Sequence, residues 1–264
     1  MGNRNPTNLI NTKTKRFRFR AENFSLDLWK DTFQSWPKPT QGWKDLFLRI
    51  SGTNEVYWGE RKLDQCVRLS IADMEKNESM MIAASYFWSD TLNAFVFGHD
   101  LASPTLADVP MLTGLDISIA DDGGIFNWKT KYKVETRNIG GWSGYVQKYG
   151  QTGSIGQTEH AIFLNMWLDK FIFCGRSVGP TSIYLSAAER LANGHRFLLG
   201  RYLLGSVYHL LHQVVEKLLL GKSISNQGGS WWFINCGLIP ICTNAFSGIS
   251  LHSSFHEILL KNKN

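Results

Sequence analysis

Residues 161–174 read AIFLNMWLDKFIFC, and this stretch decides the fold. It is apolar almost all round, and a helix without a polar face belongs inside a protein. The run is too short for a membrane span, which needs about 20 apolar residues, and it contains Asp169 and Lys170. We predict a buried helix that begins near Glu159, whose charge suits a helix start, and ends at Gly175, where positive φ is tolerated.

Two more helices are predicted directly after this run, over residues 184–193 and 195–220, each followed by a glycine. The second is amphipathic, because apolar side chains recur at three- and four-residue steps and so share one face. These apolar positions are Leu199, Leu203, Val207, Leu210, Leu211, Val214 and Leu218. We expect the three helices to pack on one another, with the first of them buried.

The composition describes a globular chain with a basic balance. Of the 264 residues, 43% are hydrophobic and 19% are charged, as in folded proteins, and the length allows one large domain or two small ones. The net charge of +6 and the pI of about 9.1 favour an acidic partner. The four cysteines show no paired spacing, so we predict a reducing compartment without disulfides. No signal peptide or membrane span is predicted.

Residues 1–22 form a basic N-terminal tail whose cations are interleaved with Phe17 and Phe19. The basic side chains at its centre are Lys13, Lys15, Arg16, Arg18 and Arg20. Runs of this kind bind nucleic acid or direct nuclear import. The other interpretation is a solvated tail, or a short edge strand in which arginine and phenylalanine alternate.

Aromatic residues dominate positions 24–50, from Trp29 and Phe33 to Trp43 and Phe47. A pair of prolines is expected to divide this region into two short helices. We interpret the aromatic stripe as core rather than as a binding surface. One or two further helices are predicted over residues 55–87.

A short strand over residues 95–97 precedes a short helix. Thr105 and Asp108 have the spacing of a capping box at the start of this helix, and Gly114 ends it. Pro110 is expected to strain or kink the helix, because a proline ring disturbs the turn before it. The apolar face of the helix holds Leu106, Val109 and Leu112.

Residues 116–158 are polar and rich in glycine, and we predict a flexible insertion that splits one domain into two halves. The region carries neither a GxGxxG nor a Walker phosphate-binding pattern. Near the C-terminus, Gly237 and Pro240 are expected to interrupt a helix. The folded body is therefore expected to span residues 23–235, with an irregular tail over 236–264.

A set of motif residues is distributed over the two halves of the chain. These are Phe95, Phe97, Thr105, Leu106, Asp108, Val109, Leu112, Gly114, Leu115, Trp167, Phe171, Trp231 and Trp232. With them the chain resembles the plant mobile domain, also called the aminotransferase-like plant mobile domain, of maintenance-of-meristems-type proteins and some plant transposable elements. The resemblance covers roughly residues 25–235. The expected fold is mainly α, a multi-helix globular domain with a few short strands and a glycine-rich insertion.

The resemblance implies a non-enzymatic interaction module of the nucleus, with the cytoplasm as the second compartment. Relatives act in gene expression, in silencing of transposable elements and in meristem maintenance, through protein partners that include a phosphatase-like plant protein. The family continues after residue 235 into another aromatic-rich helix that this sequence lacks, so we expect a truncated copy. The alternatives are a nucleic-acid-binding domain derived from a transposable element and, more remotely, an enzyme.

No catalytic, cofactor-binding or metal-ligating residue is predicted. A pyridoxal-phosphate enzyme needs a Schiff-base lysine and a phosphate cup on an α/β scaffold, and the sequence has no alternating βαβ pattern. His209, His212 and Glu216 share one helix face. They are either metal ligands or part of the solvent-exposed polar face of the helix, and we predict the latter. His160, beside Glu159, is either a base or a local polar contact, and we predict the contact.

Overall fold

The computed structural model describes residues 26–97, 101–118, 129–150 and 153–245. The fold is mainly α with one small antiparallel sheet, as predicted. Its strands, in spatial order, are β1 (Trp88–Ser89), β2 (Ala94–Val96) and β3 (Leu101–Ala102). Phe95 pairs with Trp88 on one side and with Ala102 on the other, so the predicted strand lies at the centre of the sheet.

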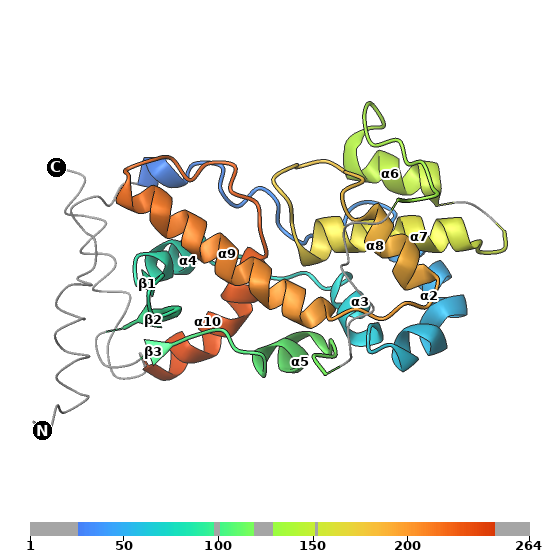
Figure 1. The fold of residues 1–264 in the computed structure, drawn as a ribbon. Coiled ribbons are helices and arrows are strands. Elements are labelled where there is room, and N and C mark those ends of the chain that lie inside the picture. Colours follow the sequence, from blue (N-terminus) through green and yellow to red (C-terminus); the bar gives the residue numbers. More distant parts are fainter. Residues whose placement is uncertain (1–25, 98–100, 119–128, 151–152, 246–264) are drawn as a thin grey trace, which may run out of the picture.

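The helices form two groups, of which one lies to the right and one to the left in Figure 1. The right-hand group contains α2 (Trp43–Glu60), α3 (Asp64–Leu69), α6 (Gly141–Tyr149), α7 (Gln157–Met166), the π-helix η3 (Trp167–Ile172) and α8 (Leu185–Ala192). The left-hand group contains the sheet, η2 (Leu26–Trp29), α4 (Glu78–Ser85), α5 (Asp108–Thr113), α9 (Leu199–Leu219) and α10 (Trp231–Ala245). Contacts between α3 and α5 join the groups.

The predicted buried helix is the centre of the right-hand group. It consists of α7 and η3, whose side chains are buried from Glu159 to Asp169. The indole of Trp43 stacks against Phe163 at a ring-centroid distance of 4.7 Å and against Phe171 at 4.8 Å. Because each packed aromatic side chain buries roughly 150–250 Å², these contacts tie α2 firmly to the buried helix.

The aromatic stripe of residues 24–50 is core, as predicted, but its helices differ from the prediction. The 3-10 turn η2 precedes the prolines, and one long helix, α2, follows them and runs to Glu60. Trp43, Ile50 and Trp58 are all buried along α2, so its apolar face continues beyond the expected end. Tertiary packing of this face outweighs the weak local preferences on which the prediction rests.

The long helix α9 has the predicted apolar face, since every apolar position expected there, from Leu199 to Leu218, is buried. The expected packing of three consecutive helices is wrong in part. α7 packs on α8, whereas α9 packs against α4, α5, α10 and β1. Gly194 takes a φ of 94°, and residues 195–198 then carry the chain from one helix group to the other.

The contacts predicted between Thr105 and Asp108 are present, although α5 begins only at Asp108 and its N-cap residue, Ala107, has no side-chain hydrogen bond. The Asp108 carboxylate accepts hydrogen bonds from the Thr105 backbone N–H at 2.6 Å and from the Thr105 hydroxyl at 2.7 Å. Gly114 ends the helix with a φ of 72°, as predicted. One expectation is wrong, because Leu106 precedes the helix and is 39% exposed. Pro110 is the third residue of the helix, where a proline is tolerated because first-turn N–H groups have no intrahelical partner.

Two segments predicted to be irregular contain helices. Within residues 116–158, α6 packs on α2 and α7 and buries Tyr145, so this part of the insertion is structured. At the C-terminus, α10 runs to Ala245, past Gly237 and Pro240, and extends the body beyond residue 235. Glycine and proline cost a helix about 1 and 3 kcal/mol, and burial of large side chains at the start of α10 outweighs this cost. These side chains are Trp231, Trp232, Phe233 and Ile234.

Candidate interaction site

The motif residues predicted from the sequence are mostly core residues. Those that are buried are Phe95, Val109, Leu115, Trp167, Phe171, Trp231 and Trp232. Phe97, Asp108, Leu112 and Gly114 are half-buried, and Thr105 and Leu106 are exposed. Phe95 and Asp108 line a cavity of about 70 Å³ together with Phe233, which follows the Trp231–Trp232 pair in the chain. Trp167 and Phe171 belong instead to η3 in the right-hand group, so the buried motif residues are distributed over the cores of both groups.

The polar side chains of α9 that raised the question of metal binding contact other groups. His212 Nε2 lies 2.9 Å from Asn93 Oδ1, and His209 Nε2 lies 2.8 Å from Gln213 Nε2. In the described part of the chain, no group of three His, Cys, Asp or Glu side chains is placed to hold a metal ion. These histidines lie on the polar side of the helix, where the periodicity places them.

His160 and Glu159 lie in the first turn of α7 and are both buried. Trp58 Nε1 donates a hydrogen bond to His160 Nε2 at 3.0 Å, and Glu159 forms an ion pair with Arg49. Burial, with a smaller effect of the Arg61 charge, lowers the pKa of His160 to about 4. The imidazole is therefore neutral at pH 7 and holds α2 against α7.

Some predictions concern residues outside the described ranges. The basic run Lys13, Lys15, Arg16, Arg18 and Arg20 precedes residue 26, so the structure does not place the predicted nucleic-acid or import patch. Of the cysteines within the described ranges, Cys66, Cys174 and Cys236 are free thiols. Among the described residues, no helix is long and apolar enough to cross a membrane.

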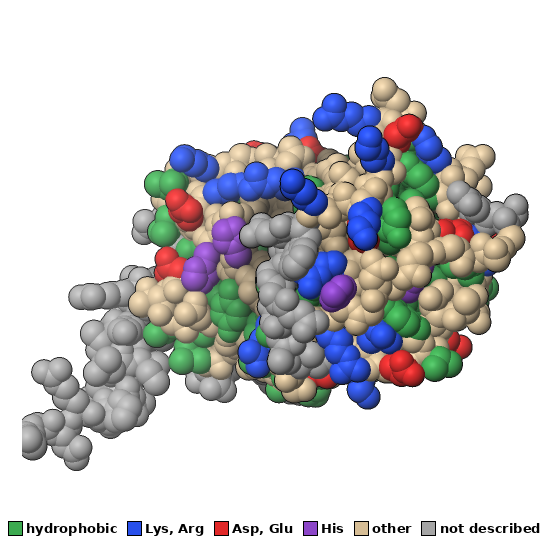
Figure 2. All heavy atoms as spheres, turned by 45° about the vertical axis from the view of Figure 1, so that its right-hand side comes forward, with side chains coloured by type: hydrophobic (Ala, Val, Ile, Leu, Met, Phe, Trp, Pro, Cys, Tyr) green, Lys and Arg blue, Asp and Glu red, His purple; other side chains and the backbone are tan. Residues whose placement is uncertain are grey.

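An open groove of about 510 Å³ runs along α9. Its lining residues are Phe173, Tyr184, Leu198, Arg201, Tyr202, Gly205, Ser206 and His209. Gly205 is exposed in the middle of the helix and has no atom within 4 Å of the position that a Cβ would take. The missing side chain deepens the groove at this point. The surface view in Figure 2 shows Lys, Arg and His side chains on the visible face of the molecule, with hydrophobic and acidic side chains between them.

The opposite wall of the groove is formed by the segment between η3 and α8, residues 173–184. The rings of Phe173 and Tyr184 stack within it at a centroid distance of 4.8 Å. Val178 and Ile183 project from the same segment and are 55% and 67% exposed. We call residues 175–184 the rim. Neither Val178 nor Ile183 lines the groove itself, whose wall is formed by the two rings.

Hydrogen bonds from the buried side chains Asp169 and Asn165, and one from Trp142 at the surface, hold the rim in place. The carboxylate of Asp169, which is 2% exposed, accepts from the Thr181 backbone N–H at 2.8 Å and from its hydroxyl at 2.7 Å. Asn165 Nδ2 donates to the Thr181 carbonyl at 2.9 Å, and Trp142 Nε1 donates to the Val178 carbonyl at 2.7 Å. Burial raises the pKa of Asp169, an effect that the Thr181 hydrogen bonds partly offset. The aliphatic side chains of the rim are thus presented by a fixed backbone.

The π-helix η3 connects the rim to the core. It ends at Ile172, and Cys174, two residues later, takes the left-handed φ of 45° that we expected at Gly175. The carbonyl groups at this end find donors in the segment before α10: Gly229 N–H donates to the Cys174 carbonyl at 2.7 Å, and Ser230 Oγ donates to the Ile172 carbonyl at 2.8 Å. π-Helical turns occur frequently at functional sites, and this one aims Asp169 at the rim.

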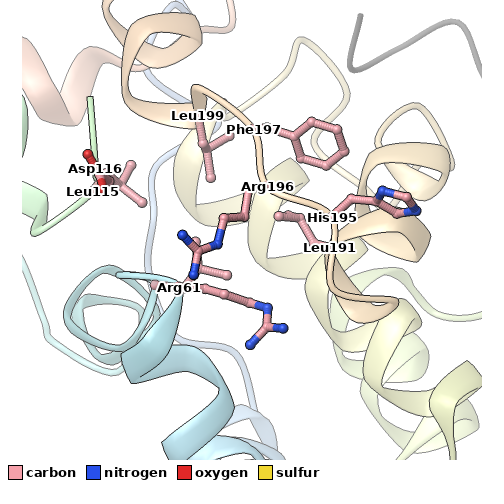
Figure 3. A pocket seen from close by; sticks show the side chains of 9 residues that line it. Arg61, Leu115, Asp116, Leu191, His195, Arg196, Phe197 and Leu199 are labelled. Atoms are coloured by element: carbon pink, nitrogen blue, oxygen red, sulfur yellow. The ribbon is translucent and has the colours of Figure 1, made fainter. Parts of the chain in front are cut away.

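A second hollow lies where the two helix groups meet (Figure 3). The side chains of Arg61 and Arg196 extend into it, with Asp116 on one side and His195 on the other. Arg196 Nη2 donates to the Glu60 carbonyl at 3.4 Å. The cavity measures about 10 Å³, which is room for no more than one water molecule. We regard it as a polar seam between the groups and not as a ligand pocket.

The sequence did not identify the groove residues. Phe173, Tyr184 and Tyr202 looked like core aromatics, and the wall depends on a contact between segments far apart in the chain. Two signals were present: the small pair Gly205 and Ser206 within a helix, and aliphatic residues in the connection between two predicted helices.

The fold and the groove define a helical domain whose motif residues build the core and whose long helix faces an open surface groove. The family model of the plant mobile domain matches residues 63–237, and the chain belongs to this family. The match includes the sheet, the buried helix, the rim and the first part of α10. No curated protein and no solved structure matches the chain.

Proposed function

We propose that this plant mobile domain is a non-catalytic protein-interaction module of the nucleus, which docks protein partners in the groove along α9. The observation that carries the proposal is the rim: Val178 and Ile183 are 55% and 67% exposed, yet Thr181 between them donates two hydrogen bonds to the buried carboxylate of Asp169. A pinned backbone loses little conformational entropy when a partner binds, so the surface is organised in advance.

The processes and partners follow from the family resemblance. We propose roles in gene expression, transposable-element silencing and meristem maintenance, as in maintenance-of-meristems-type proteins, with a phosphatase-like plant protein as the first partner to examine. Two buried ionisable groups of the kind that enzymes use are engaged in hydrogen bonds within the fold, which supports a non-catalytic role. Asp169 accepts a hydrogen bond from Thr181, and His160 accepts one from Trp58.

The test is a capture of partners from plant nuclear extract by the tagged chain, with one variant that fills the groove. Gly205→Trp places an indole in the groove, and Gly52→Trp is the matched control. Both glycines are exposed within long helices, and a Cβ would meet no atom within 4 Å at either position. Circular dichroism and thermal melting establish that both variants fold.

We expect the wild type and Gly52→Trp to retain the same stoichiometric protein partner, and Gly205→Trp to lose it. Retention of that partner by all three proteins, or recovery of no stoichiometric partner by any of them, would count against the groove as the docking site.

Nucleic-acid binding is the second candidate function. It is favoured by the net charge of +6 and by the run of Lys13, Lys15, Arg16, Arg18 and Arg20. Because phosphate contacts release counterions, binding to random DNA should weaken steeply with salt, and removal of residues 1–22 should reduce that dependence. Affinity that is insensitive to salt and to the truncation contradicts this candidate.

A further inference from the structure

We infer that the groove along α9 binds an acidic peptide segment that also carries a large apolar side chain. This inference rests on the proposed docking function and adds the chemistry of the occupant. Three observations support it: the charge of the groove, its apolar lining, and the hydrogen-bond state of its polar groups.

The basic residues that line the groove are Arg201 and His209, and the lining contains no Asp or Glu. They belong to a stripe along α9 with one residue at every fourth position. Its members are Arg201, Gly205, His209, Gln213 and Lys217. The three members that line the groove, Arg201, Gly205 and His209, cover roughly 12 Å of the helix, which suits a few successive residues of a partner chain.

The apolar part of the groove lining fits a large apolar side chain of the partner. Leu198 and Tyr202 form the floor at one end, and the stacked Phe173 and Tyr184 rings form the wall. Because Gly205 contributes no side chain, and a Cβ there would meet no atom within 4 Å, the helix leaves room for a side chain of the partner at this position. An aliphatic or aromatic residue of the partner fits this position and also covers the exposed Ile183 of the rim.

The polar groups of the groove differ in whether their hydrogen-bond donors are already engaged within the fold. The Ser206 hydroxyl donates to the Leu203 carbonyl at 2.7 Å and lies 3.3 Å from the Ser230 hydroxyl, so it is already engaged. Arg201 donates through Nε to the Ile117 carbonyl at 3.0 Å, which orients its guanidinium group. Within the described residues, the Nη atoms of Arg201 have no hydrogen-bond partner, and a paired set of N–H groups favours a carboxylate.

Other occupants fit the groove less well. Nucleic acid binds through many phosphate contacts, and the aliphatic side chains of the rim have no partner on a phosphate backbone. A second copy of the chain, docked through the same groove about a twofold axis, would place Arg201 and His209 opposite basic groups of the same kind. An acidic peptide with an apolar anchor satisfies both parts of the surface.

The experiment is a selection of short random peptides displayed on phage, with the full wild-type chain as bait and counter-selection on Gly205→Trp. Selected peptides are then synthesised with a fluorophore, and their binding is measured by fluorescence anisotropy to wild type, Gly52→Trp and Arg201→Glu. We expect peptides that place Asp or Glu next to Leu, Ile, Phe or Trp. Arg201→Glu should weaken them roughly tenfold, and exchanging their acids for lysine should restore binding to this variant only.

Each other outcome contradicts a defined part of the argument. Peptides that depend on Gly205 but lack acidic residues overturn the inferred charge and leave the docking function intact. Absence of any Gly205-dependent peptide overturns both. Displacement of the peptide by single-stranded DNA at physiological salt identifies nucleic acid as the occupant, and a dimer of the wild type that Gly205→Trp abolishes identifies a second copy.

Discussion

Two glycines of α9 provide a sharp test of the packing, because the same substitution should have opposite effects on stability. Gly200 faces α5, and a Cβ there would lie 2.8 Å from Val109 Cγ1, 3.0 Å from Ile117 Cγ2 and 3.3 Å from the Asp116 carbonyl oxygen. At Gly205 the same atom would meet nothing within 4 Å. We therefore compare Gly200→Ala with Gly205→Ala.

The magnitudes follow from two competing effects. Alanine is favoured over glycine in a helix by about 1 kcal/mol, so Gly205→Ala should stabilise the protein by roughly 0.5–1 kcal/mol. Gly200 is the second residue of α9, where the helical preference is smaller. Overpacking a tight contact costs about 1–3 kcal/mol, and Val109 is 0% exposed and has little room to move. Gly200→Ala should therefore destabilise by roughly 1–2 kcal/mol.

The assay is urea-induced unfolding at equilibrium, followed by far-UV circular dichroism, with Gly52→Ala as a second open-site control. The midpoint should rise for Gly205→Ala and Gly52→Ala and fall for Gly200→Ala at an unchanged slope. Equal stabilisation by all three substitutions would refute the close approach of α5 and α9, and with it the position of the motif residues around Val109.

Three further predictions concern other parts of the fold. Val207→Asp should leave the chain unfolded or aggregated in size-exclusion chromatography, because Val207 is 0% exposed and an unpaired buried charge costs several kcal/mol; a soluble monomer with an unchanged melting temperature would refute the register of α9. The pKa of His160 is depressed from 6.5 to about 4, so the neutral ring stabilises the fold above pH 6.5, and this contribution is lost as the pH falls toward 4. Between pH 6.5 and 4 the free energy of unfolding of the wild type should fall by on the order of 3 kcal/mol more than that of His160→Gln. If the free energies of unfolding of the two proteins change with pH in parallel, the burial of this ring is contradicted. Asp169→Ala should accelerate amide hydrogen exchange across residues 175–184 while the exchange of α9 stays unchanged, and unchanged protection of the rim would show that Asp169 does not hold it.

The sequence predicts those features whose cause is local or periodic. The apolar face of α9 follows from its spacing, and the contact between Thr105 and Asp108 follows from two side chains three residues apart. The buried character of residues 161–174 follows from composition alone. In each case the residues that determine the feature lie close together in the sequence, so a short sequence window is enough to predict it.

The features that sequence reasoning missed depend on contacts between distant segments. The helix α10 passes Gly237 and Pro240 because its aromatic start is buried against α4, α5 and α9. The helix α6 forms within a glycine-rich region because Tyr145 reaches the Ile162 carbonyl and Asn165 of α7. The groove has the same origin, since its floor and wall are separated in sequence and meet only in the folded chain.

The π-helix explains why a buried carboxylate is present in so apolar a segment. Burial of Asp169 raises its pKa, which means that the fold bears a cost to keep this group where it is. A core helix alone would be more stable with an apolar residue at that position. The carboxylate instead accepts two hydrogen bonds from Thr181 and fixes the segment that exposes Val178 and Ile183. The buried carboxylate of Asp169 thus costs the core stability and in return fixes the backbone of the rim, and the proposed docking surface depends on this arrangement.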